Sequence, residues 1–261
     1  MINTMSDAKI IKTRNKDGHK HVGANVPLRN VHDRLSQVAE NYLLSLYVLK
    51  EEGQRATAGH LADHLKGLPV GEGLGTSLPS VLGMLRRMAK EGLIQLTADK
   101  EVKLTAVGLI EAEDMVRRHR LAERMVVDVF GLELYKAHEE AHRLEHAISP
   151  EMESLIKDKL GNPTTCPFGG PIPGSGYVSP IGGVISLGNA KSGNRYDVQR
   201  VPEEDQSLLE FLVNQNILPD QTIEILEASP SRGIISVRTN VGEASLGYVV
   251  ADKIWLRSSD N

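Results

Sequence analysis

Three histidines follow one another at intervals of four residues, with a glutamate beside the last of them: His138, His142, Glu145 and His146. Residues four apart share one face of an α-helix, so this spacing predicts a helix with three imidazoles and a carboxylate on one side. Imidazole and carboxylate together are ligands for divalent first-row transition metals. The alternative is a solvated helix face that is rich in histidine. We favour a metal site, because His119 and Glu123 show the same four-residue interval on a preceding segment.

The composition is that of a globular protein, with 40% hydrophobic and 25% charged residues in a chain of 261. No apolar run approaches the roughly 18 residues that cross a bilayer. The N-terminus also lacks the apolar core of a secretory signal, so we expect a cytoplasmic protein without membrane contact. Cys166 is the single cysteine, which excludes an internal disulfide and agrees with a reducing compartment.

Charge is unevenly distributed along the chain. Residues 1–100 carry 14 Lys and Arg against 10 Asp and Glu, whereas the remainder carries 16 against 24. A basic front suggests a polyanion partner at that end. Residues 1–32 are predicted to form a basic, flexible arm, which is either a disordered terminus or a segment that touches DNA phosphates.

Residues 33–105 show the element order of a winged helix-turn-helix domain. Apolar residues repeat at helical spacing over 35–49, Thr57 caps a shorter second helix, and Ser77 opens a third. The stretch 93–105 contains two alternating segments around a polar turn, which predicts a hairpin. In a winged helix-turn-helix the third helix enters the DNA major groove.

The rest of the chain divides into a helical part, a linker and a β-rich tail. Residues 106–162 are predicted to form three helices, of which the first runs to Phe130 and the second, to about Ala147, carries the histidines. The Gly and Pro content of 163–183 indicates a linker. Alternating runs such as TIEIL, GIISVRT and SLGYVV in 184–261 predict a small β-barrel. The expected fold class is therefore mainly α with β.

Three segments resemble the diphtheria toxin repressor family of iron- and manganese-dependent transcriptional regulators: RRHRLAERMV (117–126), HEEAHRLEH (138–146) and CPFGGPIPG (166–174). They occur in order and at compatible distances, and the resemblance covers roughly residues 34–257. It implies an N-terminal winged helix-turn-helix, a central helical dimerisation and metal domain, and a C-terminal SH3-like (FeoA-like) barrel. It also implies a homodimer that binds a palindromic double-stranded DNA operator when metal is bound.

The resemblance implies the metal ligands by position: His119, Glu123 and His138 for an ancillary site, and His142, Glu145 and His146 for a second site that couples metal to DNA binding. Position 142 is Cys or Glu in the family. Possible extra ligands are Asn41, where the family has Met or Asp, and Glu203 from the C-terminal domain. Donors without thiolate or thioether favour Mn(II) or Fe(II), while Zn(II), Co(II) or Ni(II) can substitute in vitro. Cys166 is expected not to bind metal, because it lies in the linker.

Candidate DNA contacts lie at the start and on the face of the predicted third helix: Ser77, Pro79, Ser80, Arg86 and Arg87. The first three match family positions that touch thymine methyls and phosphates, and the two arginines either contact phosphates or form a solvated face. Leu82 and Gly83 replace polar residues that face DNA in relatives. The glycine-rich stretch 67–75 looks like an insertion before this helix.

Two other functions fit parts of the sequence. The pattern H-x-x-E-H at 142–146 is the inverted zinc-protease motif, in which Glu145 would be the general base, but five residues are a weak signal. A metal-binding or transport accessory protein would fit the FeoA-like tail if Leu82 and Gly83 mark a loss of DNA binding. The interpretation we adopt is a repressor that controls manganese or iron homeostasis and is not an enzyme.

Overall fold

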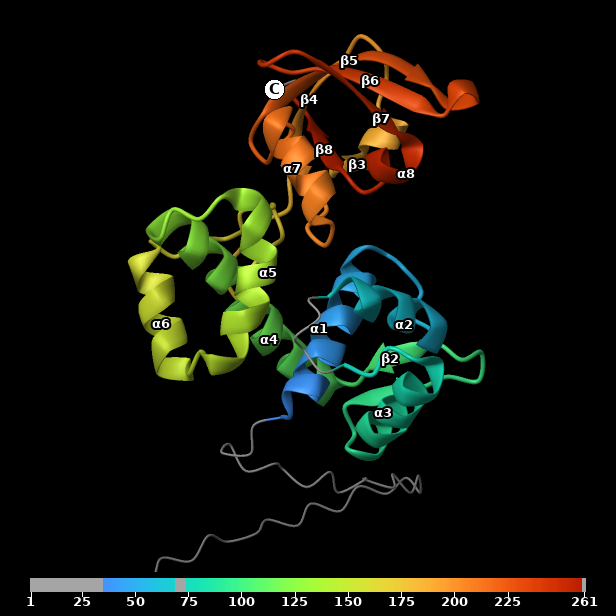
Figure 1. The fold of residues 1–261 in the computed structure, drawn as a ribbon, viewed down its shortest axis with the longest axis vertical. Coiled ribbons are helices and arrows are strands. Elements are labelled where there is room, and N and C mark those ends of the chain that lie inside the picture. The colour runs from blue at the N-terminus through green and yellow to red at the C-terminus, as the bar shows by residue number, and fades with distance from the viewer. Residues whose placement is uncertain (1–34, 69–73, 260–261) are drawn as a thin grey trace, which may run out of the picture. The chain divides into compact units, whose positions relative to one another are not determined.

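A computed structural model describes residues 35–68 and 74–259 (Figure 1). The predicted arm, 1–32, and the middle of the 67–75 stretch lie outside these residues. Within the two described ranges, no helix combines the length and the apolar character that crossing a membrane requires.

The N-terminal part consists of three helices and a hairpin: α1 (Gln37–Glu51), α2 (Ala58–Gly67), α3 (Leu78–Lys90), β1 (Ile94–Leu96) and β2 (Val102–Leu104). Side-chain caps set the helix starts, since Thr57 Oγ1 accepts the N–H of His60 at 3.2 Å and Ser77 Oγ accepts that of Ser80 at 3.4 Å. The helices share a core in which Leu43, Leu61 and Leu85 are fully buried. β1 and β2 pair antiparallel, which confirms the predicted order of three helices and a hairpin.

The central part contains α4 (Ala106–Arg124), α5 (Leu134–Leu144) and α6 (Pro150–Lys159). Two of the predicted helices do not stay α-helical to their ends. Residues Met125–Val129 form a π-helical turn, and Glu145–Ala147 form a 3-10 turn. Each irregular turn adjoins the segment that carries candidate ligands, which is a common place for such turns.

The C-terminal part is a six-stranded antiparallel sheet in the order β3-β8-β4-β5-β6-β7, with two short helices. Its elements are β3 (Ile185–Ser186), β4 (Arg195–Arg200), α7 (Gln206–Asn214), β5 (Thr222–Ser229), β6 (Ile234–Arg238), β7 (Glu243–Gly247), α8 (Tyr248–Ala251) and β8 (Trp255–Ser258). The run SLGYVV, predicted as a strand, is strand only to Gly247 and then turns into α8.

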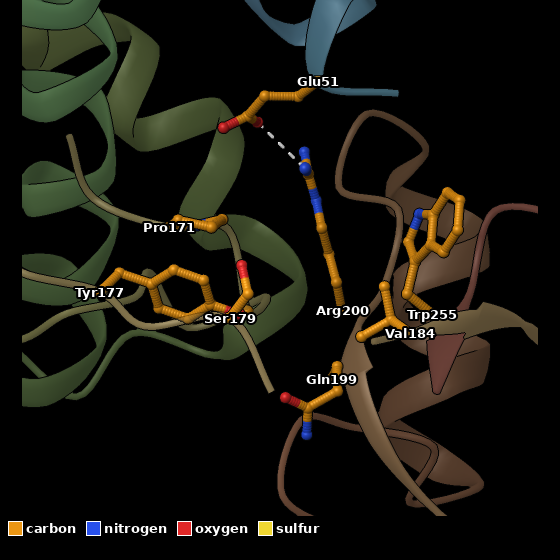
Figure 2. A pocket seen from close by; sticks show the side chains of 9 residues that line it. Glu51, Pro171, Tyr177, Ser179, Val184, Gln199, Arg200 and Trp255 are labelled. Carbon is orange, nitrogen blue, oxygen red and sulfur yellow. Dashed lines mark hydrogen bonds and ion pairs between the residues drawn. The ribbon is translucent and has the colours of Figure 1, made fainter. Parts of the chain in front are cut away.

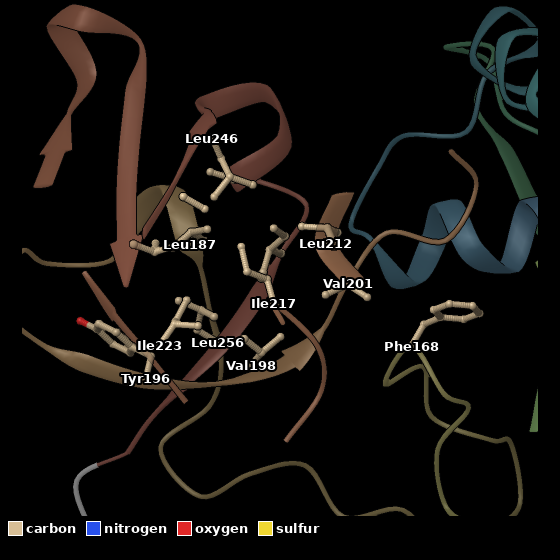
Figure 3. Close-up of a cluster of buried hydrophobic side chains, with 14 of the residues drawn as sticks. Phe168, Leu187, Tyr196, Val198, Val201, Leu212, Ile217, Ile223, Leu246 and Leu256 are labelled. Carbon is tan, nitrogen blue, oxygen red and sulfur yellow. The ribbon is translucent and has the colours of Figure 1, made fainter. Parts of the chain in front are cut away.

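The core of this sheet also holds the linker in place. Val198, Ile223 and Leu256 converge in Figure 3, and all three are fully buried. Phe168 of the linker belongs to the same buried cluster, and its carbonyl accepts the N–H of Val201 at 3.0 Å. At Gly169, with φ +90°, a Cβ would lie 1.8 Å from the Gln199 carbonyl oxygen, so only glycine fits there. The linker is therefore pinned to the end of β4.

Candidate metal centre

Four potential ligands from three segments of the chain converge: His119, Glu123, His138 and Glu203. One donor atom of each lies within 4.8 Å of the donor atoms of the other three. His119 and Glu123 are one helical turn apart on α4, His138 comes from the adjacent α5, and Glu203 follows β4. His119, Glu123 and Glu203 are buried, and His138 is nearly so.

Hydrogen bonds leave part of this cluster unsatisfied. Glu123 Oε1 lies 2.9 Å from His119 Nε2 and 3.1 Å from His138 Nδ1. Glu123 Oε2 and His138 Nε2 are buried, and neither has a hydrogen-bond partner in the described part of the chain. Buried polar atoms are nearly always paired, so these atoms call for a further group. A divalent cation fits this donor set of imidazole nitrogens and carboxylate oxygens.

His142 and Glu145 lie against the same centre rather than apart from it. Donor atoms of His119, His138 and His142 lie within 4.8 Å of one another. Glu145 Oε2 is 2.5 Å from His119 Nδ1, and its Oε1 is 3.1 Å from His142 Nδ1. Because Glu145 contacts Nδ1 of His119, the other ring nitrogen is directed at Glu123. A carboxylate such as Glu145 commonly orients a metal-binding imidazole in this way. The two predicted triads are thus in direct contact.

His146 lies in a 3-10 turn and not on the α-helix predicted for it. α5 ends at Leu144, and His146 lies in the 3-10 turn that follows. There its Nε2 is 3.5 Å from Glu145 Oε1, the oxygen that His142 Nδ1 also contacts at 3.1 Å. Its Nδ1 lies 2.7 Å from Glu40 Oε2 on α1, and Arg118 Nη2 lies 2.8 Å from the other oxygen of Glu40. Glu145 therefore lies between His142 and His146, and Glu40 of α1 is a further partner of His146.

Asn41, the other predicted ligand on α1, is fully buried beside Glu40. Sequence reasoning passed over Glu40 itself. Its only sequence signal is its position next to Asn41 at the start of the first helix.

Burial and neighbouring charges set the protonation of the centre. Burial opposes a charge on His119, but Glu123 and Glu145 outweigh it and raise the pKa of His119 well above its usual value. Burial likewise opposes a charge on Glu145, yet His142 and His119 lower its pKa to about 2. Burial raises the pKa of Glu203, and the charge of Glu123 adds to this. In the absence of metal, a proton on His119 supplies positive charge between two ionised carboxylates.

Cys166, which we predicted not to bind metal, lies beside the centre, although it is not among the four converging donors. It is fully buried, and its Sγ is 3.8 Å from Glu203 Oε2. Burial, followed by the charges of Glu123 and Glu203, raises the pKa of the thiol well above its usual value. Its position follows from the pinning of Phe168 and Gly169, which a linker composition does not reveal. The only sequence signal was its place in the CPFGGPIPG segment.

The five candidate DNA contacts, Ser77, Pro79, Ser80, Arg86 and Arg87, are all exposed on α3 or at its cap. Arg87 Nε donates to Glu91 Oε1 at 2.9 Å, so its charge is balanced within the helix end. Gly83 is exposed on the same helix, and a Cβ there would meet no atom within 4 Å. The packing of the fold therefore does not require glycine at this position.

Two family models match the chain. The model described as "Iron dependent repressor, metal binding and dimerisation domain" matches residues 105–174, and the FeoA domain model matches residues 185–258. Between them they cover the candidate metal centre and the C-terminal sheet.

Full-length relatives and solved structures are also similar. The iron-dependent repressor IdeR of Mycobacterium leprae (strain TN) is 33% identical over 233 residues, which is 84% of this chain and 96% of the relative. A structure of a manganese-dependent transcriptional repressor in complex with manganese is 31% identical, with a TM-score of 0.74, over 85% of this chain and 100% of that one. ScaR with bound Cd²⁺ is 27% identical, with a TM-score of 0.70, over 84% of this chain and 99% of that one.

Proposed function

We propose that the chain, which belongs to the diphtheria toxin repressor family of metal-dependent transcriptional repressors, is a cytoplasmic homodimer. This homodimer binds a palindromic DNA operator when a divalent metal is bound. Its regulated genes would serve manganese or iron homeostasis. Residues 33–105 would be the DNA-binding domain, 106–162 the metal and dimerisation domain, 163–183 the linker, and 184–261 the FeoA-like domain.

The observation that carries this proposal is the buried convergence of His119, Glu123, His138 and Glu203 around unpaired donor atoms. These four side chains would hold Mn(II) or Fe(II), and Cys166 is a candidate fifth donor. When bound, the ion supplies a positive charge that the two carboxylates share. A thiolate is a softer ligand than a carboxylate, so participation of Cys166 would favour Fe(II) or Zn(II) over Mn(II).

His142, Glu145 and His146, together with Glu40 and Asn41, would form the second centre at the contact between α5 and α1. This centre would join the helical metal domain to the winged-helix domain, because His146 contacts Glu40 on α1. Glu145 is fully buried and contacts both His119 and His142. Such a carboxylate is not the free general base that the H-x-x-E-H interpretation needs, and the family is one of regulators rather than enzymes.

DNA would be read by α3. Its exposed residues Ser77, Pro79 and Ser80 lie at the helix N-terminus, the end that contacts base edges in helix-turn-helix proteins. Arg86 would add a phosphate contact. In a two-fold symmetric dimer, two copies of α3 would lie about one DNA turn, roughly 34 Å, apart on a palindromic site.

The experiment that tests this function is binding of the purified full chain to DNA from its own upstream region, and to fragments selected from a random DNA pool. Mn(II), anaerobic Fe(II) and Zn(II) are titrated, each with a chelator control. We expect binding that appears with metal and disappears with chelator, and its loss in Glu123→Gln. Glu139→Gln is the matched control, because Glu139 lies on α5 outside the donor cluster and its side chain is 43% exposed. Metal binding without metal-dependent DNA binding would instead indicate the accessory-protein function.

A further inference from the structure

Glu51, the last residue of α1, is held by two arginines that come from different parts of the chain. Arg120 on α4 makes a two-pronged contact, with Nη1 3.0 Å from Glu51 Oε1 and Nη2 2.5 Å from Oε2. Arg200, at the end of β4, places Nη1 3.0 Å from Glu51 Oε2. Figure 2 shows Arg200 extending from its strand toward Glu51, with Trp255 alongside. One carboxylate thus joins α1, α4 and β4.

This ion-pair cluster is shielded from solvent. The side chain of Arg120 is 1% exposed, that of Arg200 14% and that of Glu51 18%. Burial opposes ionisation of Glu51, but the hydrogen bonds and charges of Arg120 and Arg200 outweigh it and lower the pKa of Glu51. A guanidinium fork that grips a carboxylate has a fixed geometry, unlike the flexible contact of an ammonium. The cluster therefore constrains direction as well as distance.

The Arg120 guanidinium is tightly packed. Its Nη1 also donates to the carbonyl oxygen of Pro171, and a Cβ at Gly170 would lie only 2.8 Å from its Nε. The guanidinium accordingly has little freedom to move without shifting the linker or Glu51. Packing of this kind transmits displacement instead of absorbing it.

Each arginine adjoins a residue of the candidate metal centre. Arg120 directly follows His119 on α4, and Arg200 lies three residues before Glu203. Two of the four donor residues, His119 on α4 and Glu203 after β4, are therefore close in sequence to the arginines that hold Glu51. Glu51 receives both contacts in a structure in which both segments also contribute to the donor cluster.

We propose that Glu51, Arg120 and Arg200 are positioning residues that link assembly of the metal centre to the orientation of α1, and through α1 to the winged helix. This inference rests on the proposed function, which it deepens by giving a route for regulation. None of the three residues is a donor in the centre. Substituting any of them should therefore reduce the effect of bound metal on α1 much more than it reduces the affinity for metal.

The first test uses hydrogen exchange and needs no DNA. The full chain is compared with and without Mn(II), and exchange is followed at the backbone amides of residues 37–51. Wild-type protein should show slower exchange of these amides when Mn(II) is added. Arg200→Gln should lose most of this slowing while its Mn(II) affinity changes by less than about threefold. Arg200→Lys, which keeps the charge without the planar fork, should retain part of it.

Arg195→Gln is the matched control, because Arg195 lies on the same strand but its side chain is 71% exposed. It should behave as wild type. Glu51→Gln removes the carboxylate that Arg120 and Arg200 share and leaves two buried positive charges without it, which can destabilise the fold. The thermal unfolding of this variant is therefore measured first. If it does not fold, the two Arg200 variants carry the test.

The second test measures the factor by which saturating Mn(II) tightens binding to a DNA fragment that the wild type selects from a random pool. Arg200→Gln should lower this factor about tenfold, a change typical of allosteric coupling. Because coupling between two ligands is reciprocal, the factor by which DNA tightens Mn(II) binding should fall by the same amount. An unchanged factor and persistent slowing of exchange in Arg200→Gln would overturn this inference and leave the repressor function standing. Absence of metal-dependent DNA binding in the wild type would instead refute the proposed function.

Discussion

His146 Nδ1 lies 2.7 Å from Glu40 Oε2, a contact that joins the end of α5 to the first helix across 106 positions of sequence. Arg118 of α4 lies 2.8 Å from the other oxygen of Glu40. Three helices therefore meet at one buried carboxylate. His146 Nε2 also lies 3.5 Å from Glu145 Oε1, so His146 stays next to the other candidate ligands while it contacts α1.

Glu40→Gln should weaken metal-dependent DNA binding by about tenfold, since a neutral amide is a weaker partner than a carboxylate for His146 and Arg118. The measurement is the affinity for operator DNA at saturating Mn(II), with Glu139→Gln as the surface control. Equal affinities in the two variants would show that Glu40 has no part in the second centre.

Metal binding should release protons, and metal affinity should fall as the pH is lowered. Glu123 and Glu145 raise the pKa of His119, so this imidazole keeps its proton to a higher pH in the metal-free protein than in the unfolded chain. Its contribution to the stability of the metal-free fold is complete below the unfolded pKa of about 6.5 and is lost as the pH rises through the folded pKa. Rising pH therefore removes the competing proton. Calorimetry in buffers of different ionisation enthalpy would measure the release, and a buffer-independent enthalpy would contradict it.

Cys166→Ser should change the spectrum of the Co(II)-substituted protein. A Cys166 thiolate bound to Co(II) would give an intense sulfur-to-metal charge-transfer band in the near ultraviolet, and serine would remove it. The d–d bands should persist, because the imidazole and carboxylate donors remain. Identical spectra of the two proteins, each loaded with one equivalent of Co(II), would exclude Cys166 as a ligand.

Arg86 and Arg87 should differ in their effect on DNA binding, although they are neighbours on α3. Both side chains are exposed, but Arg87 already donates a hydrogen bond to Glu91 at 2.9 Å. Arg86→Gln should therefore weaken binding across all DNA sequences and reduce the salt slope by about 1. Arg87→Gln should have the smaller effect. Salt titrations of both variants test this, and equal losses would show that the Glu91 pair does not restrain Arg87.

Glu52→Gln should stabilise the fold in alkaline but not in acidic solution. Burial, with the charge of Glu204 second, raises the pKa of Glu52 from 4.5 to about 7. The folded protein then holds a proton that the unfolded chain loses above pH 4.5, so the wild type loses stability as the pH rises from there to about 7. Glutamine removes this penalty, which is on the order of 1 kcal/mol because solvent screens a partly buried group. Urea unfolding at pH 5 and pH 8 measures the difference, and an equal gain at both values would refute the titration of Glu52.

Local patterns in the sequence were sufficient for the helices of the N-terminal part. Ser36, Thr57 and Ser77 cap α1, α2 and α3 through bonds that span three residues, and apolar residues at helical spacing form the faces that pack together. These are interactions within a few residues, so spacing and residue type determine them. The same locality made His119 and Glu123, one turn apart on α4, recognisable as a pair of ligands.

Tertiary structure decided which ligands meet. His146 contacts Glu40 of α1 as well as Glu145, and the linker residues that pack against β4 bring Cys166 to Glu203. Both outcomes depend on contacts between residues at least 37 positions apart, which no spacing rule encodes. The pairing of Glu51 with Arg120 and Arg200 is of the same kind. A buried charge must find an opposite charge wherever the packing supplies one, and only the assembled fold determines where that is.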